Sequence, residues 1–299
     1  MGHRDCPCRF CVQTQGILLP RSVKRMALPA PAVLTQAVKR ATRQAPYADK
    51  PMLKPFLILQ LRPEAEAADD EFAAILHKAG LTPDEAHRIR LDQQRLPNDL
   101  SLDDHAGVIV GGGPGCVSDA PEEKSPIEAR IEADVLSLMP QITERDFPFL
   151  GCCYGIGILG KHLEAAVGKG RYGEPVGTSD CSLTDAGRAD PLLADMPDRF
   201  QAFVGHKEAL EELPEGCAHL VHSAACPFQM VRYGRHVYAT QFHPEADAQG
   251  FETRIKIYRH RGYFPPETAE DLIAMCRAAE VHAPERILRN FVKRYRADA

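Results

Sequence analysis

The segment 151–155, which reads G-C-C-Y-G, constrains the fold of this chain more than any other feature. It directly follows the apolar run F-P-F-L at 147–150, which indicates a buried strand that turns sharply into a helix. In such a turn the positions two before and two after the tip approach each other, so both must be small. Both are glycine only when the tip is Cys153. The spacing therefore predicts Cys153 as a nucleophile and Cys152 as a buried neighbour, although both could also be ordinary core cysteines.

A second motif, Q-F-H-P-E at 241–245, follows a run of strand-forming residues. Side chains two positions apart on a strand point to the same side, so His243 and Glu245 can act together. His243 is then predicted to be the general base toward Cys153, with Glu245 fixing its tautomer and supporting the imidazolium. The helix that starts after Cys153 is expected to favour its thiolate form. Alone, the motif would equally fit a surface histidine beside a solvated glutamate.

A third motif, V-I-V-G-G-G-P-G at 108–115, reads as a buried strand that runs into a glycine-rich turn. The turn lacks the lysine and the Ser/Thr of a phosphate-binding loop, and it also lacks the spacing of a dinucleotide-binding loop. We therefore expect no nucleotide and no other cofactor. The backbone N–H groups of Gly113 and Tyr154 are instead predicted to form an oxyanion hole, with a plain tight turn as the alternative.

In this order and spacing the three motifs resemble those of the class I (triad) glutamine amidotransferases, above all the glutaminase lobe of GMP synthases. The likeness covers about residues 52–247 and includes V-G-H-K-E at 204–208 and the stretch 223–229. It implies a flavodoxin-like α/β fold and hydrolysis of the side-chain amide of glutamine through a thioester on Cys153. The candidate substrate-binding residues are Gly112, His206, Lys207 and Ser223.

The sequence departs from this family in two places that bear on substrate binding. Gly157 stands where the family motif G-x-C-x-G-H-Q has a substrate-holding glutamine, and the family's H-G-D loop reads H-K-E here. Loss of one hydrogen bond to a charged group costs about 1.5–3 kcal/mol. We therefore expect weak glutamine binding unless another group, such as Lys207, completes the pocket.

No S-G-G-x-D-S loop of a synthetase occurs in the sequence. The leading hypothesis is therefore a stand-alone glutaminase that supplies ammonia to an unknown acceptor, such as a separate synthetase subunit. Two alternatives stay open: a γ-glutamyl hydrolase of the same fold, and a non-catalytic regulatory domain. The sequence shows no secretory signal and no long apolar run, and its net charge is −5. It thus predicts a cytoplasmic protein that binds neither membrane nor nucleic acid.

Strand and helix patterns alternate along the chain up to the cysteine turn. Residues 56–61 read as a buried strand and 71–79 as an amphipathic helix, and Ser125 begins a capping box that opens a helix to about Met139. This alternation predicts an open, mainly parallel sheet with helices on both faces. After Thr184 the strand patterns come closer together, which predicts antiparallel hairpins.

The two ends differ from the predicted amidotransferase domain at 52–247. Residues 1–51 hold nine Lys/Arg and two acidic residues and are broken by prolines, so we predict a basic, disordered leader. This segment could also be a transit peptide, or translation could begin at Met52. Its C-x-C-x-x-C run has poor spacing for zinc, so no metal is predicted. Residues 248–299 show helical patterns and are predicted to form a C-terminal helical extension.

Overall fold

The computed structural model describes residues 53–296, so the predicted leader lies outside the described residues. The strands of its main sheet are β1 (Phe56–Gln60), β2 (Ala86–Arg90), β3 (Gly107–Val110), β4 (Phe149–Cys152), β6 (Glu174–Leu183), β7 (Arg199–His206), β9 (Cys217–Ser223), β10 (Met230–Tyr233) and β11 (Val237–Thr240). They lie in the order β2-β1-β3-β4-β11-β10-β9-β6-β7. A small second sheet pairs β5 (Val167–Gly168) with β8 (Ala209–Leu210).

The main sheet has two parts that differ in strand direction. β2, β1, β3, β4 and β11 are parallel neighbours, whereas β11, β10, β9, β6 and β7 are joined by antiparallel pairs. The predicted parallel sheet and the predicted hairpins after Thr184 are both confirmed. β11 belongs to both parts, because it pairs in parallel with β4 and antiparallel with β10.

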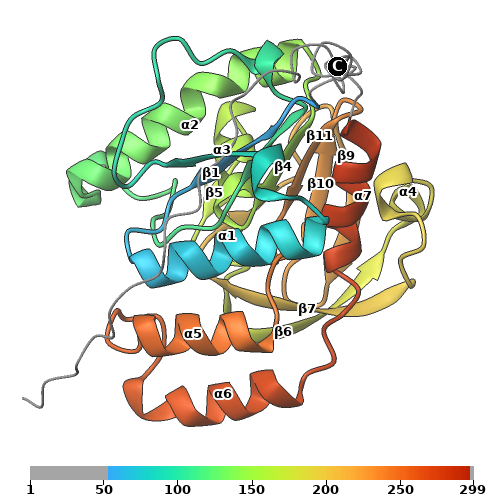
Figure 1. Ribbon diagram of the computed structural model, residues 1–299. Coiled ribbons are helices and arrows are strands. Elements are labelled where there is room, and N and C mark those ends of the chain that lie inside the picture. Colours follow the sequence, from blue (N-terminus) through green and yellow to red (C-terminus); the bar gives the residue numbers. More distant parts are fainter. Residues whose placement is uncertain (1–52, 297–299) are drawn as a thin grey trace, which may run out of the picture. The chain divides into compact units, whose positions relative to one another are not determined.

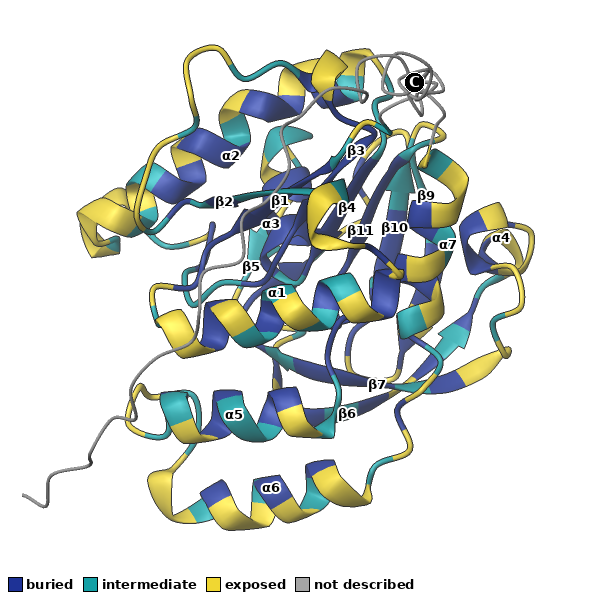
Figure 2. Cartoon of the chain, viewed as in Figure 1, coloured by how far each residue is buried: buried dark blue, intermediate teal, exposed yellow. Residues whose placement is uncertain are grey.

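Helices cover both faces of the sheet, as the alternation of patterns predicts (Figure 1). One face packs against α1 (Ala65–Ala79) and α7 (Glu285–Tyr295), and the other against α2 (Pro126–Glu144) and α3 (Tyr154–His162). Alternate residues of β1 enter the two cores, which explains why residues 56–59 are all apolar. Figure 2 shows the result: the central strands are buried, and the helices expose one side to solvent.

The helix α2 begins with the predicted capping box but ends later than predicted. The N–H of Glu128 donates to Ser125 Oγ (3.2 Å), and the N–H of Ser125 donates to Glu128 Oε2 (2.9 Å). The helix continues past Met139 although Pro140 lies inside it. Ile142, in the next turn, is fully buried in the core. Its burial offsets the backbone hydrogen bond that the proline removes.

The predicted C-terminal helices are present and contribute to the core. α5 (Ala248–Tyr258) and α6 (Ala269–Ala278) pack against each other, and α5 also contacts α1. The ring of Phe203 on β7 stacks on Phe251 of α5, with 4.6 Å between ring centroids. α7 buries Ile287, Leu288, Phe291 and Val292. Among the described helices, which include the short α4 (Asp185–Arg188), none is long and apolar enough to cross a membrane.

Candidate active site

The turn around Cys153 has the strained geometry of a nucleophile elbow. β4 ends at Cys152, α3 begins at Tyr154, and Cys153 between them has φ 55° and ψ −87°. Residues with a side chain rarely adopt this conformation, and holding one there costs about 1–3 kcal/mol. The N–H of Cys153 donates to the carbonyl of Thr240 (2.7 Å), which ties the turn to β11. Such strain points to a functional constraint on this residue.

Steric crowding requires glycine at only one of the two glycine positions that flank the turn. A Cβ atom at Gly151 would lie 2.9 Å from the backbone of Gly155, which is closer than real Cβ atoms come to other atoms. A Cβ at Gly155 would make ordinary contacts, the nearest with Val110 at 3.8 Å. The expectation that both positions must be small is therefore right for Gly151 and wrong for Gly155, where a Cβ would point toward β3.

The two adjacent cysteines lie in different surroundings. Cys152 is fully buried in the core that faces α1 and α7, and burial raises the pKa of its thiol well above the usual value. Cys153 is half-buried and lines a cavity together with His243. Burial raises the pKa of the Cys153 thiol to about 12, although the nearby Arg62 guanidinium lowers it. A pKa this high makes the thiol the form present near neutral pH, which differs from the thiolate expected at a helix start.

His243 and Glu245 interact, but not along a strand as the second motif predicts, because β11 ends at Thr240 and both residues lie in the turn after it. Nδ1 of His243 lies 2.8 Å from Oε1 of Glu245. Arg254 of α5 donates to the same oxygen (3.0 Å) and lies 3.3 Å from Nδ1. The Glu245 carboxylate can only accept, and it lies closer to Nδ1 than the Arg254 guanidinium does, so Nδ1 is assigned the proton and Nε2 is the basic nitrogen. Burial lowers the pKa of His243. Against the effect of burial, His243 and Arg254 hold the pKa of Glu245 far below its usual range.

A buried set of charged residues supports this pair, and the sequence analysis missed it. Arg62, just after β1, forms an ion pair with Glu71 of α1 (Nε–Oε1 2.8 Å), and both side chains are buried. Glu71 also accepts from the N–H of Gly112 (3.2 Å) and lies 4.0 Å from Arg254. The positive charges of Arg62 and Arg254 thus balance the negative charges of Glu71 and Glu245. Glu71 could have indicated this network in the sequence, because a carboxylate on the apolar side of a helix is buried and needs a buried partner.

The predicted oxyanion donors, Gly113 and Tyr154, border a second cavity beside Cys153, and Gly113 also borders the cavity that contains His243. The N–H groups of Gly111 and Gly112 are engaged by other acceptors. For the N–H of Gly113 no acceptor occurs within residues 53–296. Tyr154 is the first residue of α3, so its N–H has no partner inside the helix. Both N–H groups are available to a ligand, and their role as an oxyanion hole stays a prediction.

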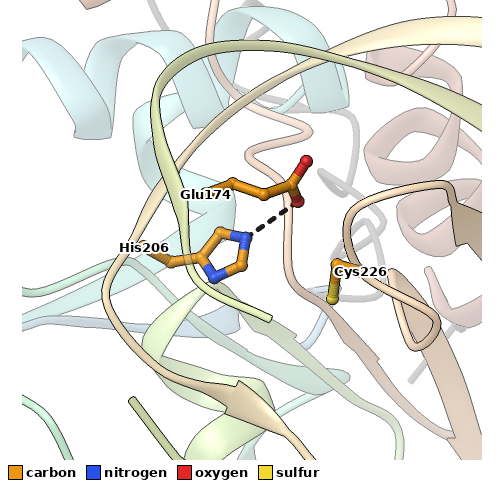
Figure 3. Close-up of side chains that lie close together, drawn as sticks. All are labelled: Glu174, His206 and Cys226. Carbon is orange, nitrogen blue, oxygen red and sulfur yellow. Dashed lines mark hydrogen bonds and ion pairs between the residues drawn. The ribbon is translucent and has the colours of Figure 1, made fainter. Parts of the chain in front are cut away.

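Two predicted substrate contacts, His206 and Ser223, belong to a buried hydrogen-bond network. Nε2 of His206 lies 3.0 Å from Oε2 of Glu174 (Figure 3), and Nδ1 lies 2.9 Å from the carbonyl of Glu208. Ser223 Oγ accepts from the side chain of Gln229 (3.1 Å), and Ser223 is not among the cavity-lining residues. His206 borders the cavity, but both of its ring nitrogens have internal partners. This placement favours structural roles for both residues.

Cys226 lies near His206 and Glu174, and together these residues could hold a metal ion (Figure 3). Their ligand atoms lie within 4.8 Å of one another, and all three residues are buried. The side-chain amide of Gln229 already donates to Glu174 (2.5 Å), however. Hydrogen bonds therefore account for this cluster without an ion.

The two departures from the family, at Gly157 and in the H-K-E loop, are linked in space. A Cβ at Gly157 would lie 2.9 Å from Oε1 of Glu208 and 3.1 Å from Cγ2 of Val117. Glu208 is held there by the N–H of Val117 (2.9 Å) and by the N–H and hydroxyl of Ser118 (2.9 and 2.6 Å). The missing side chain at 157 therefore makes room for a carboxylate from another loop.

Gly157→Ala should lower the free energy of unfolding by about 1–3 kcal/mol, because the added methyl group overpacks a filled site. Urea denaturation followed by circular dichroism measures this change. Gly170→Ala is the matched control, since nothing lies within 4 Å of a Cβ there. Gly157→Gln should be at least as destabilised, so it should not restore glutamine binding by itself. Equal stability of Gly157→Ala and Gly170→Ala would show that Glu208 moves away without cost.

Two chambers meet at Cys153, and both also border Gly113, Gly205 and Tyr263. In the aromatic chamber the other walls include His243, Val176, Phe251, Ile255, Tyr258 and Phe264. In the polar chamber they include Tyr154, His206, Lys207, Glu208 and Gln241. The hydroxyl of Tyr263 donates to the carbonyl of Pro114 (2.9 Å), and Nζ of Lys207 lies 4.1 Å from the centre of the Tyr263 ring. The loop after α5 is thus fixed at the junction of the chambers.

Comparison with known proteins agrees with this architecture. The family described as "Glutamine amidotransferase class-I" matches residues 73–256. A GMP synthase of Prochlorococcus marinus is 33% identical over 145 residues, which cover 46% of this chain and 24% of that protein. A GMP synthase of Streptococcus uberis is 27% identical over 167 residues, which cover 54% of this chain and 27% of that protein. The chain thus spans about a quarter of the length of these curated relatives.

Solved structures share the fold at low sequence identity. A glutamine amidotransferase of Thermotoga maritima superposes with a TM-score of 0.60 and 22% identity, covering 81% of this chain and 98% of the other. One from Methylobacillus flagellatus gives a TM-score of 0.62 and 19% identity, covering 83% and 97%. The predicted flavodoxin-like amidotransferase fold is therefore confirmed. Because the family match extends over more than half of its residues, this chain belongs to the class I glutamine amidotransferase family.

Proposed function

We propose that this protein is a glutaminase of the amidotransferase type, which hydrolyses the side-chain amide of glutamine and releases ammonia for an acceptor. One observation carries the proposal: Cys153 occupies the tip of a strained elbow and shares a cavity with His243, whose Nδ1 is held by Glu245. Membership of the class I family supports glutamine as the substrate. The resting thiol and the neutral imidazole are the protonation states that base-assisted attack requires.

In the proposed reaction, Nε2 of His243 takes the thiol proton while the sulfur of Cys153 attacks the amide carbon. The N–H groups of Gly113 and Tyr154 donate to the oxyanion that forms. His243 then gives the proton to the amide nitrogen, the carbon–nitrogen bond breaks, ammonia leaves, and a thioester remains. His243 next deprotonates a water molecule that hydrolyses the thioester and releases glutamate. Glu245 stabilises the imidazolium at each step.

The catalytic rate should fall as the pH is lowered through a pKa below 6.5, because His243 must be neutral and burial lowers its pKa from that value. Between this point and the pKa of about 12 for Cys153, ionisation of the thiol should not raise the rate. A profile of kcat/KM against pH measures the acid limb. The ultraviolet absorbance of thiolate, compared between the wild type and Cys153→Ser, checks the resting thiol. An acid limb above pH 7, or thiolate at neutral pH, would contradict this assignment.

The ammonia acceptor we propose is a separate synthetase subunit. The curated relatives are named as glutamine-hydrolysing GMP synthases, and this chain matches about a quarter of their length. A putative GMP synthase subunit from Thermoplasma acidophilum has a similar fold, with a TM-score of 0.51, 19% identity and coverage of 76% of this chain and 95% of the other. A nucleophilic thiol functions where thiols stay reduced, which supports a cytoplasmic location. Co-purification of the tagged full chain with a synthetase tests the partner.

An electrophilic glutamine analogue tests the reaction itself. The pure protein should be labelled at Cys153, and with glutamine it should release equal amounts of glutamate and ammonia. Peptide mass spectrometry locates the label, and an enzyme-coupled assay measures glutamate. Labelling at Cys152 or Cys116 would overturn the choice of nucleophile. Absence of both label and turnover would favour a regulatory domain, and turnover of other γ-glutamyl amides but not of glutamine would favour a γ-glutamyl hydrolase.

A further inference from the structure

The two chambers that meet at Cys153 divide the space around the nucleophile by chemistry. The aromatic chamber contains His243, whereas His243 is not among the lining residues of the polar chamber. An amide that acylates Cys153 places its acyl part on one side of the sulfur and its amine on the other. Because His243 must reach the departing nitrogen to protonate it, the amine lies on the side of the aromatic chamber.

The polar chamber suits the other end of the substrate, an α-amino acid head group. Glu208 supplies a carboxylate there, and Lys207 supplies an ammonium group. These two charges are opposite to those of the α-ammonium and α-carboxylate groups of an amino acid, so they can attract both. Gln241 borders the same chamber and is 1% exposed, and its Oε1 atom is buried without a hydrogen-bond partner within residues 53–296. An unpaired buried acceptor is costly, and an ammonium donor would satisfy it.

The aromatic chamber is much larger than ammonia requires. The centres of water-sized spheres can occupy about 50 Å³ inside it, whereas a single water molecule needs about 10–15 Å³ by the same measure. Its walls are largely apolar, and the ring of Phe251 packs edge-on against the imidazole of His243, with 5.7 Å between ring centroids. Arg62 and Arg254 are paired with Glu71 and Glu245, so the chamber offers little net charge to an ionic group.

From these features we infer that the aromatic chamber binds the leaving amine, and that the preferred substrates are γ-glutamyl amides of amines that carry an aromatic or apolar group. The inference rests on the thiol chemistry of the proposed function. Cys153 forms a thioester with the γ-glutamyl carbon, and the carbon–nitrogen bond breaks. The thiol proton passes through His243 to the nitrogen, which leaves as a neutral amine. Water then yields glutamate and regenerates the thiol, so no oxidant or co-reactant is consumed.

The test compares γ-glutamylmethylamide, γ-glutamylbenzylamide and glutamine as substrates of the purified full chain. The two substituted amides release primary alkylamines, so they differ mainly in apolar size. Burial of the phenyl group should raise kcat/KM for the benzylamide at least about tenfold above the methylamide and above glutamine. Glutamate release measures all three reactions on one scale.

Two variants locate this preference. Val176→Phe narrows the aromatic chamber from β6 and should lower the benzylamide-to-methylamide ratio at least about tenfold. Leu213→Phe adds an aromatic ring at an exposed leucine outside both chambers and should leave the ratio within about twofold. Phe264→Ala widens the chamber and should favour a naphthylmethylamide over the benzylamide.

The possible results separate the inference from the proposed function. Hydrolysis of glutamine and the methylamide at least as fast as the benzylamide would overturn the inference and leave the glutaminase proposal intact. The inference would also be overturned if Val176→Phe left the benzylamide-to-methylamide ratio unchanged and Phe264→Ala did not favour the naphthylmethylamide over the benzylamide. If no amide is hydrolysed and no acyl group is found on Cys153, the proposed function fails and the inference fails with it.

Discussion

Replacement of Cys153 by alanine should reduce kcat/KM for amide hydrolysis by about 10⁴-fold or more. Members of a catalytic triad act as a unit, so loss of the nucleophile removes the whole covalent route. The backbone strain at residue 153 is unchanged by this substitution, so the variant should fold like the wild type. Glutamate release at saturating and subsaturating substrate gives kcat and kcat/KM, and a thermal melt confirms folding.

The matched control is Cys152→Ala, which removes the neighbouring thiol. Cys152 is fully buried in the core, so this change should cost about 1 kcal/mol of stability and little activity. The pair of variants separates chemistry from packing at adjacent positions. Activity that survives in Cys153→Ala and disappears in Cys152→Ala would reverse the assignment of the nucleophile.

Glu71→Ala should lower the free energy of unfolding by about 3–5 kcal/mol, because it leaves the buried Arg62 guanidinium without its partner. The same change removes the acceptor for the N–H of Gly112, at the base of the glycine-rich turn. We therefore expect activity to fall together with stability. Urea denaturation of the purified variant gives the unfolding free energy.

Two further variants test whether the charge pair causes this loss. Glu66→Ala lies on the same helix at an exposed position and should change stability by less than about 0.5 kcal/mol. The double variant Arg62→Met/Glu71→Met removes both charges and should be more stable than Glu71→Ala. A double variant less stable than the single one would show that packing, rather than an unpaired charge, dominates at this site.

Sequence reasoning was successful where the determining contacts are local. The elbow at Cys153 depends on residues within two positions, and the contact between His243 and Glu245 also joins residues two positions apart, although both lie in the turn after β11 rather than on the expected strand. The capping box at Ser125 spans only one turn of helix. In each case the backbone conformation fixes the geometry, so a short pattern is sufficient to predict it.

Sequence reasoning missed features that depend on contacts between distant segments. Arg254 reaches Glu245 because α5 packs beside the sheet, and nothing near Arg254 in the sequence indicates this arrangement. Gly157 and Glu208 were each recognised as departures from the family, but their contact joins α3 to the loop after β7. The helix that Ser125 begins was expected to end at about Met139, whereas the buried Ile142 beyond that point made the longer helix favourable. Tertiary packing decided all three outcomes.

Because β11 joins the parallel and antiparallel parts of the sheet, changes that affect substrate fit can occur apart from changes at the reacting residues. Cys153 and Gly113 follow strands of the parallel part, whereas Lys207 and Glu208 follow β7 at the edge of the antiparallel part. His243 follows β11, the strand shared by both parts. Substitutions and insertions in the antiparallel part can therefore change which molecule fits beside Cys153 without moving Cys153 itself. Descendants of such a chain can diverge in specificity while they inherit an unaltered reaction.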